Sequence, residues 1–325
     1  MNPLKKGQLR DEERYMWGCG LRPHPHIYPS LLLASSFFSA LMRRKSYNLP
    51  QMPELPEVET IAQTLRRGNG SPPLPGQRIK RVTIRWPRHI AMPSVTTFRR
   101  HIRGRTITEV NRRGKYLVFP LDRGTMLIHL RMSGDLALVP ADTPAGRYDR
   151  TVFYLEDGQE LRFSDARKFG KIFLLDDPDV ILGKLGPEPL DVSFTPQILA
   201  SHLVKRRRAL KPLLMDQTFL AGLGNIYTDE ALHHARLHPL RRSDSLDMNE
   251  ITALWQGIRD ALTLGLHHSG ASIDWVYRGG NFQHHFRVYQ RSGEPCQRCG
   301  TPIERIIVGQ RGTHFCPTCQ GEVDL

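Results

Sequence analysis

Four of the five cysteines lie close together near the C-terminus, in two pairs with the spacing of metal ligands. Cys296 and Cys299 form one Cys-x-x-Cys pair, Cys316 and Cys319 form the other, and sixteen residues separate the pairs. This spacing is typical of a tetrahedral zinc site, and four thiolates leave no open position for catalysis on the metal. Two disulfides are the alternative, but disulfides are rare in intracellular chains. We therefore predict one structural Zn²⁺ and no catalytic cofactor.

The hairpin expected between the two cysteine pairs would present a cation at its tip. We predict strands over residues 302–308 and 311–315, which places Gln310-Arg311-Gly312 in the turn. The hairpin would thus hold one cation, Arg311, in a fixed position on a small, rigid platform.

Residues 52–60, with the sequence MPELPEVET, concentrate three glutamates and two prolines. Apolar residues follow at helical spacing, and a proline and an acidic residue suit the first turn of a helix. The pattern predicts a helix over residues 56–67, and the alternative interpretation is a helix start without any chemistry. Pro53 and Glu54 lie ahead of that helix, so the helix prediction does not explain them.

Three short segments of the first half combine cations, glycines and large side chains. Consecutive cations from Arg112 to Lys115 flank a glycine that permits a tight turn, and a basic hairpin tip is the simpler interpretation. Met132 precedes a Ser-Gly turn, and core filling is the simpler interpretation there. Residues 165–170 present two cations and an aromatic side chain at an expected loop tip. An exposed aromatic residue flanked by charge fits insertion between stacked bases.

The second half has helical periodicity and one glycine motif. The sequence GLGN at residues 222–225 precedes a predicted helix over 228–235. Backbone N–H groups at such a helix start bind phosphates, although a turn between two helices is the simpler interpretation. A long helix is predicted over residues 248–267. Residues 270–292 lack periodicity and are predicted to form a loop, with its histidines as polar loop residues rather than metal ligands.

The elements that must position these residues separate into a strand-rich part and a helix-rich part. The predicted strand runs are residues 78–86, 108–120, 126–139, 151–162 and 171–175. The links between them are too short for helical crossovers, so an antiparallel sandwich or barrel is expected. The sequence GPEPL at residues 186–190 is the predicted linker to the helical part.

Charge and composition point to an anionic partner. The chain has 325 residues, a formal net charge of +14 and a pI near 9.9. Residues 1–51 hold eight Lys/Arg and three Asp/Glu, so +5 lies there and +9 stays with residues 52–325. Such a field favours phosphates or anionic membranes, and a well-solvated basic surface is the alternative. No apolar run approaches the roughly 18 residues of a membrane helix, so we expect a soluble, cytoplasmic protein that does not bind membranes.

Residues 1–51 form a leader without one clear periodic element. A signal peptide would need a cleavage site that is absent here, and the acidic cluster at residues 11–13 argues against an organellar transit peptide. We favour a biological start at Met52, with the upstream residues as over-extended translation.

Taken in this order, the motifs resemble those of bacterial formamidopyrimidine-DNA glycosylases over about residues 52–320. The most specific parts are the sequence PELPEVET from residue 53, the sequence GLGNIY at 222–227 and the four-cysteine finger with its Gln-Arg tip. The residues Leu55-Pro56 favour this branch over the related endonuclease VIII branch, which typically has Gly-Pro there.

The resemblance implies an α+β fold of several domains. An N-terminal antiparallel β-sandwich with flanking helices would be followed by a helix–two-turn–helix module and a zinc finger, with DNA between the two main parts. We accordingly predict a non-family leader at 1–51, a catalytic domain at 52–185, a DNA-binding domain with a lesion-capping loop at 186–292 and a zinc finger at 293–325.

The resemblance also implies roles for individual residues. Pro53 would attack C1′ of the damaged nucleotide, and Glu54 would assist at the sugar. The residues implied to hold phosphates at or beside the lesion are Lys115, Asn225, Arg311 and Lys211. The residues implied to fill the gap left by the flipped base are Met132, Arg167 and Phe169, and Lys168 and Tyr148 complete the implied DNA-binding set. Lys168 is a departure, because many members have a second arginine there and a bidentate contact becomes a point charge.

An N-terminal proline suits this chemistry. An α-amino group titrates near 7.7–8.0, so part of it is neutral at physiological pH. Its iminium with the opened sugar would acidify the C2′ proton and permit β,δ-elimination of both phosphates.

The leading hypothesis is therefore a monomeric, bifunctional DNA glycosylase and AP lyase of base excision repair. It would act on double-stranded DNA that contains 8-oxoguanine, formamidopyrimidines or abasic sites, and would associate with the bacterial nucleoid. The alternatives are a catalytically silent DNA-binding protein, if Pro53 is not the mature N-terminus, and an endonuclease VIII-type enzyme for oxidised pyrimidines.

Overall fold

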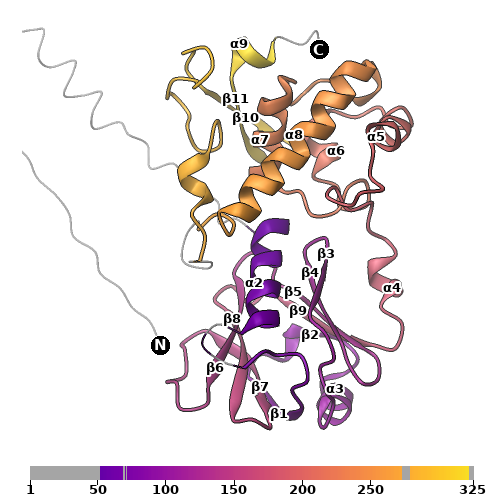
Figure 1. The fold of residues 1–325 in the computed structure, drawn as a ribbon, viewed down its shortest axis with the longest axis vertical. Coiled ribbons are helices and arrows are strands. Elements are labelled where there is room, and N and C mark those ends of the chain that lie inside the picture. The colour runs from indigo at the N-terminus through magenta and orange to yellow at the C-terminus, as the bar shows by residue number, and fades with distance from the viewer. Residues whose placement is uncertain (1–51, 69, 71, 273–278, 322–325) are drawn as a thin grey trace, which may run out of the picture. The chain divides into compact units, whose positions relative to one another are not determined.

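The computed structural model describes residues 52–68, 70, 72–272 and 279–321. The predictions for the leader at 1–51 therefore lie outside the described residues, as does the centre of the loop predicted over 270–292. Figure 1 shows two β-sheets followed by a mainly helical part and a small C-terminal hairpin. The predicted α+β class is confirmed.

The two sheets pack on one shared core and form the predicted sandwich. The first sheet has the order β1 (Ile79–Ile84), β7 (Asp149–Leu155), β8 (Gln159–Asp165) and β6 (Gly134–Pro140). The second has the order β2 (Ile90–Met92), β9 (Lys171–Leu175), β5 (Thr125–His129), β4 (Tyr116–Pro120) and β3 (Asn111–Arg113). Phe153 and Phe163 of the first sheet and Leu117 and Ile128 of the second belong to the same buried cluster. All the strand pairs are antiparallel except the short pair β2–β9.

Three of the runs predicted as strands are each divided into two strands. The run 108–120 turns at Gly114, which has a φ of 56°, and becomes the β3–β4 hairpin. The run 126–139 turns at Arg131, with a φ of 57°, and its halves β5 and β6 enter different sheets. The run 151–162 turns at Gly158, with a φ of 86°. A positive φ reverses the chain direction in a way that an extended strand cannot, so the β-branched pattern alone overstated strand length.

Helices flank the sandwich and make up the next part of the chain. The helix α2 (Leu55–Arg67) confirms the one predicted over 56–67, and α3 (Val95–Ile102), which was not predicted, packs on β1 and β2. The helical part contains α4 (Asp179–Leu182), α5 (Pro196–Leu203), α6 (Leu210–Leu214), α7 (Asn225–Ala235) and α8 (Met248–His267). Short 3₁₀ turns lie at η1 (Pro87–His89), η2 (Ser243–Ser245) and η3 (Phe282–His285).

One helix belongs to both hydrophobic cores. Leu55, at the start of α2, packs in the helical cluster with residues of α7 and α8, whereas Val58, Ile61 and Leu65 pack in the sandwich. Because a single helix enters both cores, its N-terminal end is fixed against α7 from the other half of the chain.

The C-terminal hairpin agrees with the sequence prediction, and residues 279–292 of the loop predicted before it pack against the helical part. Strands β10 (Glu304–Val308) and β11 (Arg311–Phe315) pair antiparallel and are followed by α9 (Pro317–Gln320). Phe282, Phe286 and Tyr289 are buried in the helical core. The part of 270–292 that the structure describes after residue 278 is therefore packed structure, because its aromatic side chains supply apolar area that periodicity does not register.

Candidate active site

Glu54 is the buried centre of the site. It lies just before α2 with 2% of its surface exposed, and its backbone N–H donates to Glu57 Oε2 over 2.8 Å. Its carboxylate accepts hydrogen bonds from the backbone N–H groups of Gly224 (2.7 Å), Ile226 (2.9 Å) and Tyr227 (3.3 Å). A carboxylate at the start of α7 satisfies unpaired N–H groups and complements the helix dipole.

This contact corrects one interpretation of the glycine motif. The backbone N–H groups of Gly224, Ile226 and Tyr227 bind the chain's own carboxylate, so they are not an open phosphate site. The turn between two helices is the correct interpretation. A Cβ at Gly224 would lie 2.3 Å from the carboxyl carbon of Glu54, so only glycine leaves room for this approach.

The surroundings of Glu54 bring the pKa of its carboxyl group close to physiological pH. Burial raises the pKa of Glu54 to about 7, while the positive charge of Lys115 opposes that rise. Burial likewise raises the pKa of Glu57, which accepts hydrogen bonds from the Tyr227 hydroxyl and from the Ala271 N–H. A carboxyl group with a pKa near 7 can both donate and accept a proton at neutral pH.

Lys115 is the member of the cationic run that faces Glu54. It is 3% exposed, and burial lowers its pKa, whereas the charges of Glu54 and Glu57 raise it. Arg112 and Arg113 instead pair with Glu188 at 2.8 and 3.0 Å. The two arginines therefore tie the β3–β4 hairpin to the segment that follows the sandwich, and the basic-tip interpretation is wrong for them.

The β10–β11 hairpin is attached to α7 beside this centre. Asn225 Nδ2 donates to the Gly312 carbonyl over 3.1 Å, and Lys211 Nζ lies 3.4 Å from the same oxygen. Lys211 is fully buried and paired with Asp229, which also accepts from the His314 N–H over 2.9 Å. Arg311, next to Gly312, is exposed at the hairpin tip. This arrangement brings together Glu54, Lys115, Asn225, Lys211 and Arg311.

A second group of predicted residues lies on two neighbouring turns of the sandwich. Asp165 accepts hydrogen bonds from the Ser133 hydroxyl and from the Gly170 N–H (2.7 Å), and the Arg167 N–H donates to Ser133 Oγ over 2.8 Å. One buried carboxylate thus joins the turn that bears Met132 to the turn that bears Phe169. Phe169 is 49% exposed.

Both of these turns contain a residue with a positive φ. Arg131 and Lys168, which precede Met132 and Phe169, have φ values of 57° and 65°, a region that is uncommon for residues other than glycine. The indole N–H of Trp86 donates to the Lys168 carbonyl over 3.2 Å, and the Lys168 ammonium lies 4.5 Å from the indole centroid. Such strained conformations are typical of functional turns.

Tyr148 lies beside the same two turns. Its carbonyl accepts from the Asp165 N–H over 2.8 Å, and its side chain is 42% exposed between Arg147 and Arg150.

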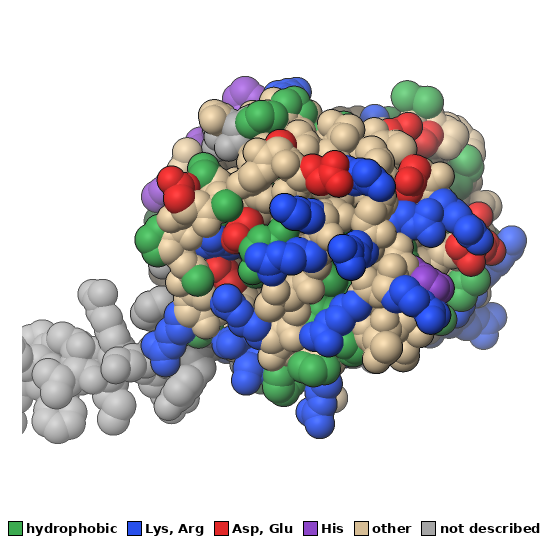
Figure 2. Space-filling view, turned by 90° about the horizontal axis from the view of Figure 1, so that it is seen from below, with side chains coloured by type: hydrophobic (Ala, Val, Ile, Leu, Met, Phe, Trp, Pro, Cys, Tyr) green, Lys and Arg blue, Asp and Glu red, His purple; other side chains and the backbone are tan. Residues whose placement is uncertain are grey.

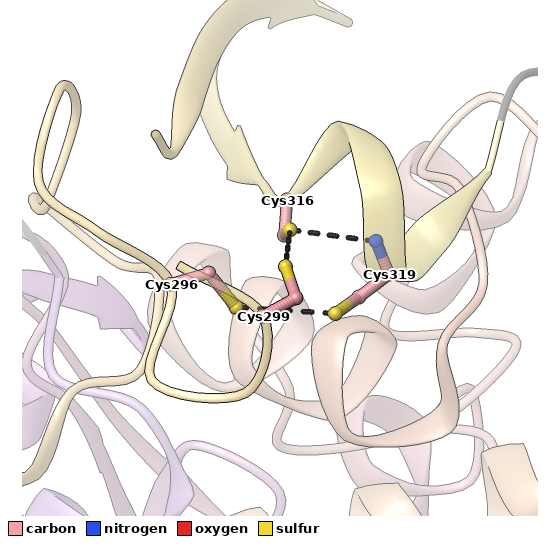
Figure 3. A group of neighbouring side chains, drawn as sticks. All are labelled: Cys296, Cys299, Cys316 and Cys319. Carbon is pink, nitrogen blue, oxygen red and sulfur yellow. Dashed lines mark hydrogen bonds between the residues drawn. The ribbon is translucent and has the colours of Figure 1, made fainter. Parts of the chain in front are cut away.

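The four cysteines meet in one cluster (Figure 3). Their Sγ atoms all lie within 4.8 Å of one another, with 3.9 Å between Cys296 and Cys319 and 3.4 Å between Cys299 and Cys316. Four zinc–sulfur bonds of roughly 2.3 Å in a tetrahedron place the sulfurs about 3.8 Å apart. The cluster therefore fits Zn²⁺ and does not contain disulfides.

Sequence reasoning missed how the zinc turn is fixed to α7. His233 Nε2 lies 3.5 Å from Cys296 Sγ. Arg298, between the first two cysteines, donates to the carbonyls of His233 (2.7 Å) and His234 (3.2 Å) at the end of α7. The position of Arg298 inside a Cys-x-x-Cys turn could have indicated that this side chain helps to fix the turn. Nothing in the sequence indicated that His233 lies beside Cys296.

Three family models match the chain. They are the formamidopyrimidine-DNA glycosylase N-terminal domain at residues 52–172, the H2TH domain of the same glycosylases at 185–276, and a zinc finger found in these glycosylases and in IleRS at 293–321. The chain belongs to the formamidopyrimidine-DNA glycosylase family. The resemblance and the structural zinc inferred from the sequence are thereby confirmed.

Individual relatives agree with the family assignment. The formamidopyrimidine-DNA glycosylase of Herpetosiphon aurantiacus is 44% identical over 277 residues, which cover 83% of this chain and 100% of the relative. That of Symbiobacterium thermophilum is 45% identical over 278 residues, or 83% of this chain and 89% of the relative.

Solved structures of family members share the fold. MutM in complex with DNA containing carbocyclic 8-oxo-G is 35% identical with a TM-score of 0.77, and Lactococcus lactis Fpg with abasic-site DNA is 35% identical with a TM-score of 0.76. Both alignments cover 83% of this chain and 100% of the other. Within the part of this chain that the structure describes, no helix combines the length and the apolar character needed to cross a bilayer.

Proposed function

We propose that the chain, with Pro53 as its mature N-terminus, is a bifunctional DNA glycosylase and AP lyase that excises oxidised purines. The observation that carries the proposal is the position of Pro53 directly before Glu54, whose pKa of about 7 suits proton transfer at neutral pH. The names of the relatives and the DNA in the similar complexes, which contains oxidised guanine or an abasic site, support the substrate class.

The proposed reaction uses one nucleophile for both steps. The neutral Pro53 nitrogen forms a bond to C1′ while the bond from C1′ to the base breaks, and the proton that the proline nitrogen carries is released to the leaving base. Glu54, in its protonated form, donates to the sugar ring oxygen, so that the ring opens and the iminium forms. Loss of the C2′ proton then expels the 3′ phosphate, and a second elimination expels the 5′ phosphate.

The proposed DNA contacts fall into two groups of residues, one around Glu54 and one on the two neighbouring turns of the sandwich. Lys115 and Arg311 would supply positive charge to the phosphates beside the flipped nucleotide, with Asn225 next to them and Lys211 holding the hairpin tip through Gly312. Met132, Arg167 and Phe169 would fill the space left by the flipped base, with Lys168 and Tyr148 contacting the same strand region. Extrusion costs a few kcal/mol, which a wedge and a kinked duplex would offset.

Borohydride trapping tests this proposal. A protein that begins at Pro53 should become covalently attached to a duplex with 8-oxoguanine opposite cytosine when borohydride reduces the iminium. The matched control retains Met52, which makes the Pro53 nitrogen a tertiary amide, and it should give no adduct. Absence of an adduct from the Pro53 form, with folding and zinc content intact, would refute the proposal.

A catalytically silent DNA-binding protein is the second candidate. Pro53 lies within the 325-residue sequence, and its nitrogen is acylated as long as Met52 precedes it. The mass of the native N-terminus separates the two candidates: a terminus at Pro53 supports the enzyme, and an unprocessed Met1 supports the silent protein. Comparing cleavage of 8-oxoguanine and thymine glycol duplexes separates the proposed specificity from an endonuclease VIII-type one.

We also propose that the protein works as a monomer on DNA in the bacterial cytoplasm. The domain limits near residues 185 and 292 remain predictions.

A further inference from the structure

The positive charge of the family part of the chain is concentrated in one stretch. Residues 77–108 contain nine Lys/Arg and no Asp or Glu. Residues 52–325 carry a formal +9 in total, so the remainder of that part is balanced in charge. This stretch comprises β1, η1, β2 and α3. None of its residues contacts Glu54 in the described hydrogen bonds, although Trp86 holds the Lys168 turn and His89 lies 3.3 Å from Asp165.

Most of these cations have no carboxylate partner. Arg78 pairs with Glu156 at 3.5 Å, and Arg105 pairs with Asp122 at 3.7 Å. Across residues 52–321, outside the gaps in the description, the structure gives no ion pair to the seven others. These are Lys80, Arg81, Arg85, Arg88, Arg99, Arg100 and Arg103, and all seven are exposed.

The cations of α3 and of β1 lie on adjoining surfaces, because α3 packs on the edge strand β1. Arg99 reaches the Ile84 carbonyl at the end of β1 over 3.5 Å, and Arg78 Nε donates to the Gly104 carbonyl behind α3 over 2.9 Å. Figure 2, which views the end of the sandwich where Figure 1 places β1 and α3, shows Lys and Arg side chains spread over much of that face. We call this surface the β1–α3 face.

The β1–α3 face is separated from Glu54 by the sandwich core. Helix α2, which follows Glu54, packs on β3, β4 and β6, whereas α3 packs on β1 and β2. Val58 and Leu65 of α2 and Phe98 and Ile102 of α3 are buried in the core between them. A straight duplex that reaches Glu54 and Arg311 therefore has the body of the sandwich between itself and α3.

Ordinary structural roles account for only part of this charge. Cations at the end of α3 complement its helix dipole, and a lysine on an edge strand discourages edge-to-edge pairing. Neither role requires seven unpaired cations without a single acid among them, and their mutual repulsion is unfavourable unless an anion lies on the face.

We propose that the β1–α3 face binds the phosphate backbone of a second duplex DNA segment while the candidate active site holds the first. Arginine-rich surfaces bind duplexes of any sequence by displacing counterions from phosphates. The contact would let the protein bridge two segments during its search for a lesion, and it does not depend on base excision itself.

The test uses the protein that begins at Pro53, which is the form that the proposed reaction requires, and an undamaged duplex. The variant Arg99→Gln, Arg100→Gln, Arg103→Gln removes three cations from α3. The control Arg67→Gln, Arg123→Gln, Lys184→Gln removes the same charge from three exposed, scattered positions. Anisotropy titrations over a salt series give the slope of log K against log salt, which changes by about 0.9 for each phosphate that the protein no longer neutralises. Bridging is measured as the amount of a fluorescent duplex that the protein retains on beads that carry a second duplex.

We expect the slope of the α3 variant to be smaller by about two to three than that of the wild type. The α3 variant should also stop bridging, while the control keeps both properties and both proteins keep wild-type borohydride trapping. An α3 variant that keeps the wild-type slope and bridging would overturn the inference. A reduced slope without any bridging by the wild type would also overturn it, because the face would then contact the flank of the same duplex. Failure of trapping in all three proteins would reject the proposed reaction. The salt slope and the bridging measurement would still test the β1–α3 face, because neither requires base excision.

Discussion

Replacement of Glu54 by glutamine should remove a loss of stability that the wild type undergoes as the pH rises. The pKa of Glu54 is raised from 4.5 to about 7 by burial, and its carboxylate is 2% exposed. Between these values the folded state keeps the proton while the unfolded state loses it, so stability falls as pH rises. At 1.36 kcal/mol per pKa unit, the shift corresponds to about 3 kcal/mol lost by pH 8.

Urea unfolding of the wild type and of Glu54→Gln at several pH values between 4 and 8 measures this effect. The stability of the variant relative to the wild type should increase by about 3 kcal/mol across that range. The glutamine amide cannot accept from all three N–H groups of α7, so the variant should start below the wild type at pH 4. The control is Glu109→Gln, at an exposed position. Its unfolding free energy should differ from that of the wild type by the same amount at every pH. A flat difference for Glu54→Gln would refute the argument that burial controls this carboxyl group.

Two further predictions concern the zinc turn and the wedge. His233→Phe removes a ring nitrogen that lies 3.5 Å from Cys296 Sγ. The variant should bind zinc about 10- to 100-fold more weakly in a chelator competition, since loss of a group that contacts a metal ligand has an effect of that size. An unchanged zinc affinity, or an equal loss in the control His234→Phe, would contradict this prediction. Phe169→Ala, at a 49% exposed position, should change unfolding free energy by less than about 0.5 kcal/mol yet reduce the fluorescence rise of 2-aminopurine placed beside a lesion. A wild-type fluorescence response would mean that Phe169 does not enter the stack.

Local patterns allowed the zinc cluster and several helices to be predicted from the sequence. The Cys-x-x-Cys spacing constrains each pair of thiolates within one turn, so the four ligands needed no long-range information. The apolar spacing of residues 248–267 likewise predicted α8 with its observed bounds, Met248–His267.

The centre of the candidate site could not be predicted in the same way. Glu54 meets the N–H groups of α7 across about 170 positions of sequence, and no local pattern encodes that contact. The roles of Arg112 and Arg113 also depended on a distant partner, Glu188, which turned an apparent basic tip into an ion-pair network. The resemblance to the family supplied Pro53 and Glu54 as a pair, whereas residues and spacing alone indicated a helix start.

The turns that bear Met132 and Phe169 illustrate the limit set by backbone conformation. Neither Arg131 nor Lys168 is a residue type that favours a positive φ, yet both adopt one. Tertiary contacts hold these conformations, among them the Trp86 N–H to the Lys168 carbonyl and the Asp165 carboxylate between the two turns. Sequence propensity therefore predicted one strand across the turn at Arg131, whereas the loop tip at residues 165–170 was predicted from its composition.

The most direct test of the central claim is the position of the covalent bond in the borohydride-trapped complex. Protease digestion and mass spectrometry of the adduct formed by the Pro53 form should place the reduced sugar remnant on the N-terminal proline. An adduct on a lysine, such as the buried Lys115 beside Glu54, would contradict the proposed role of Pro53.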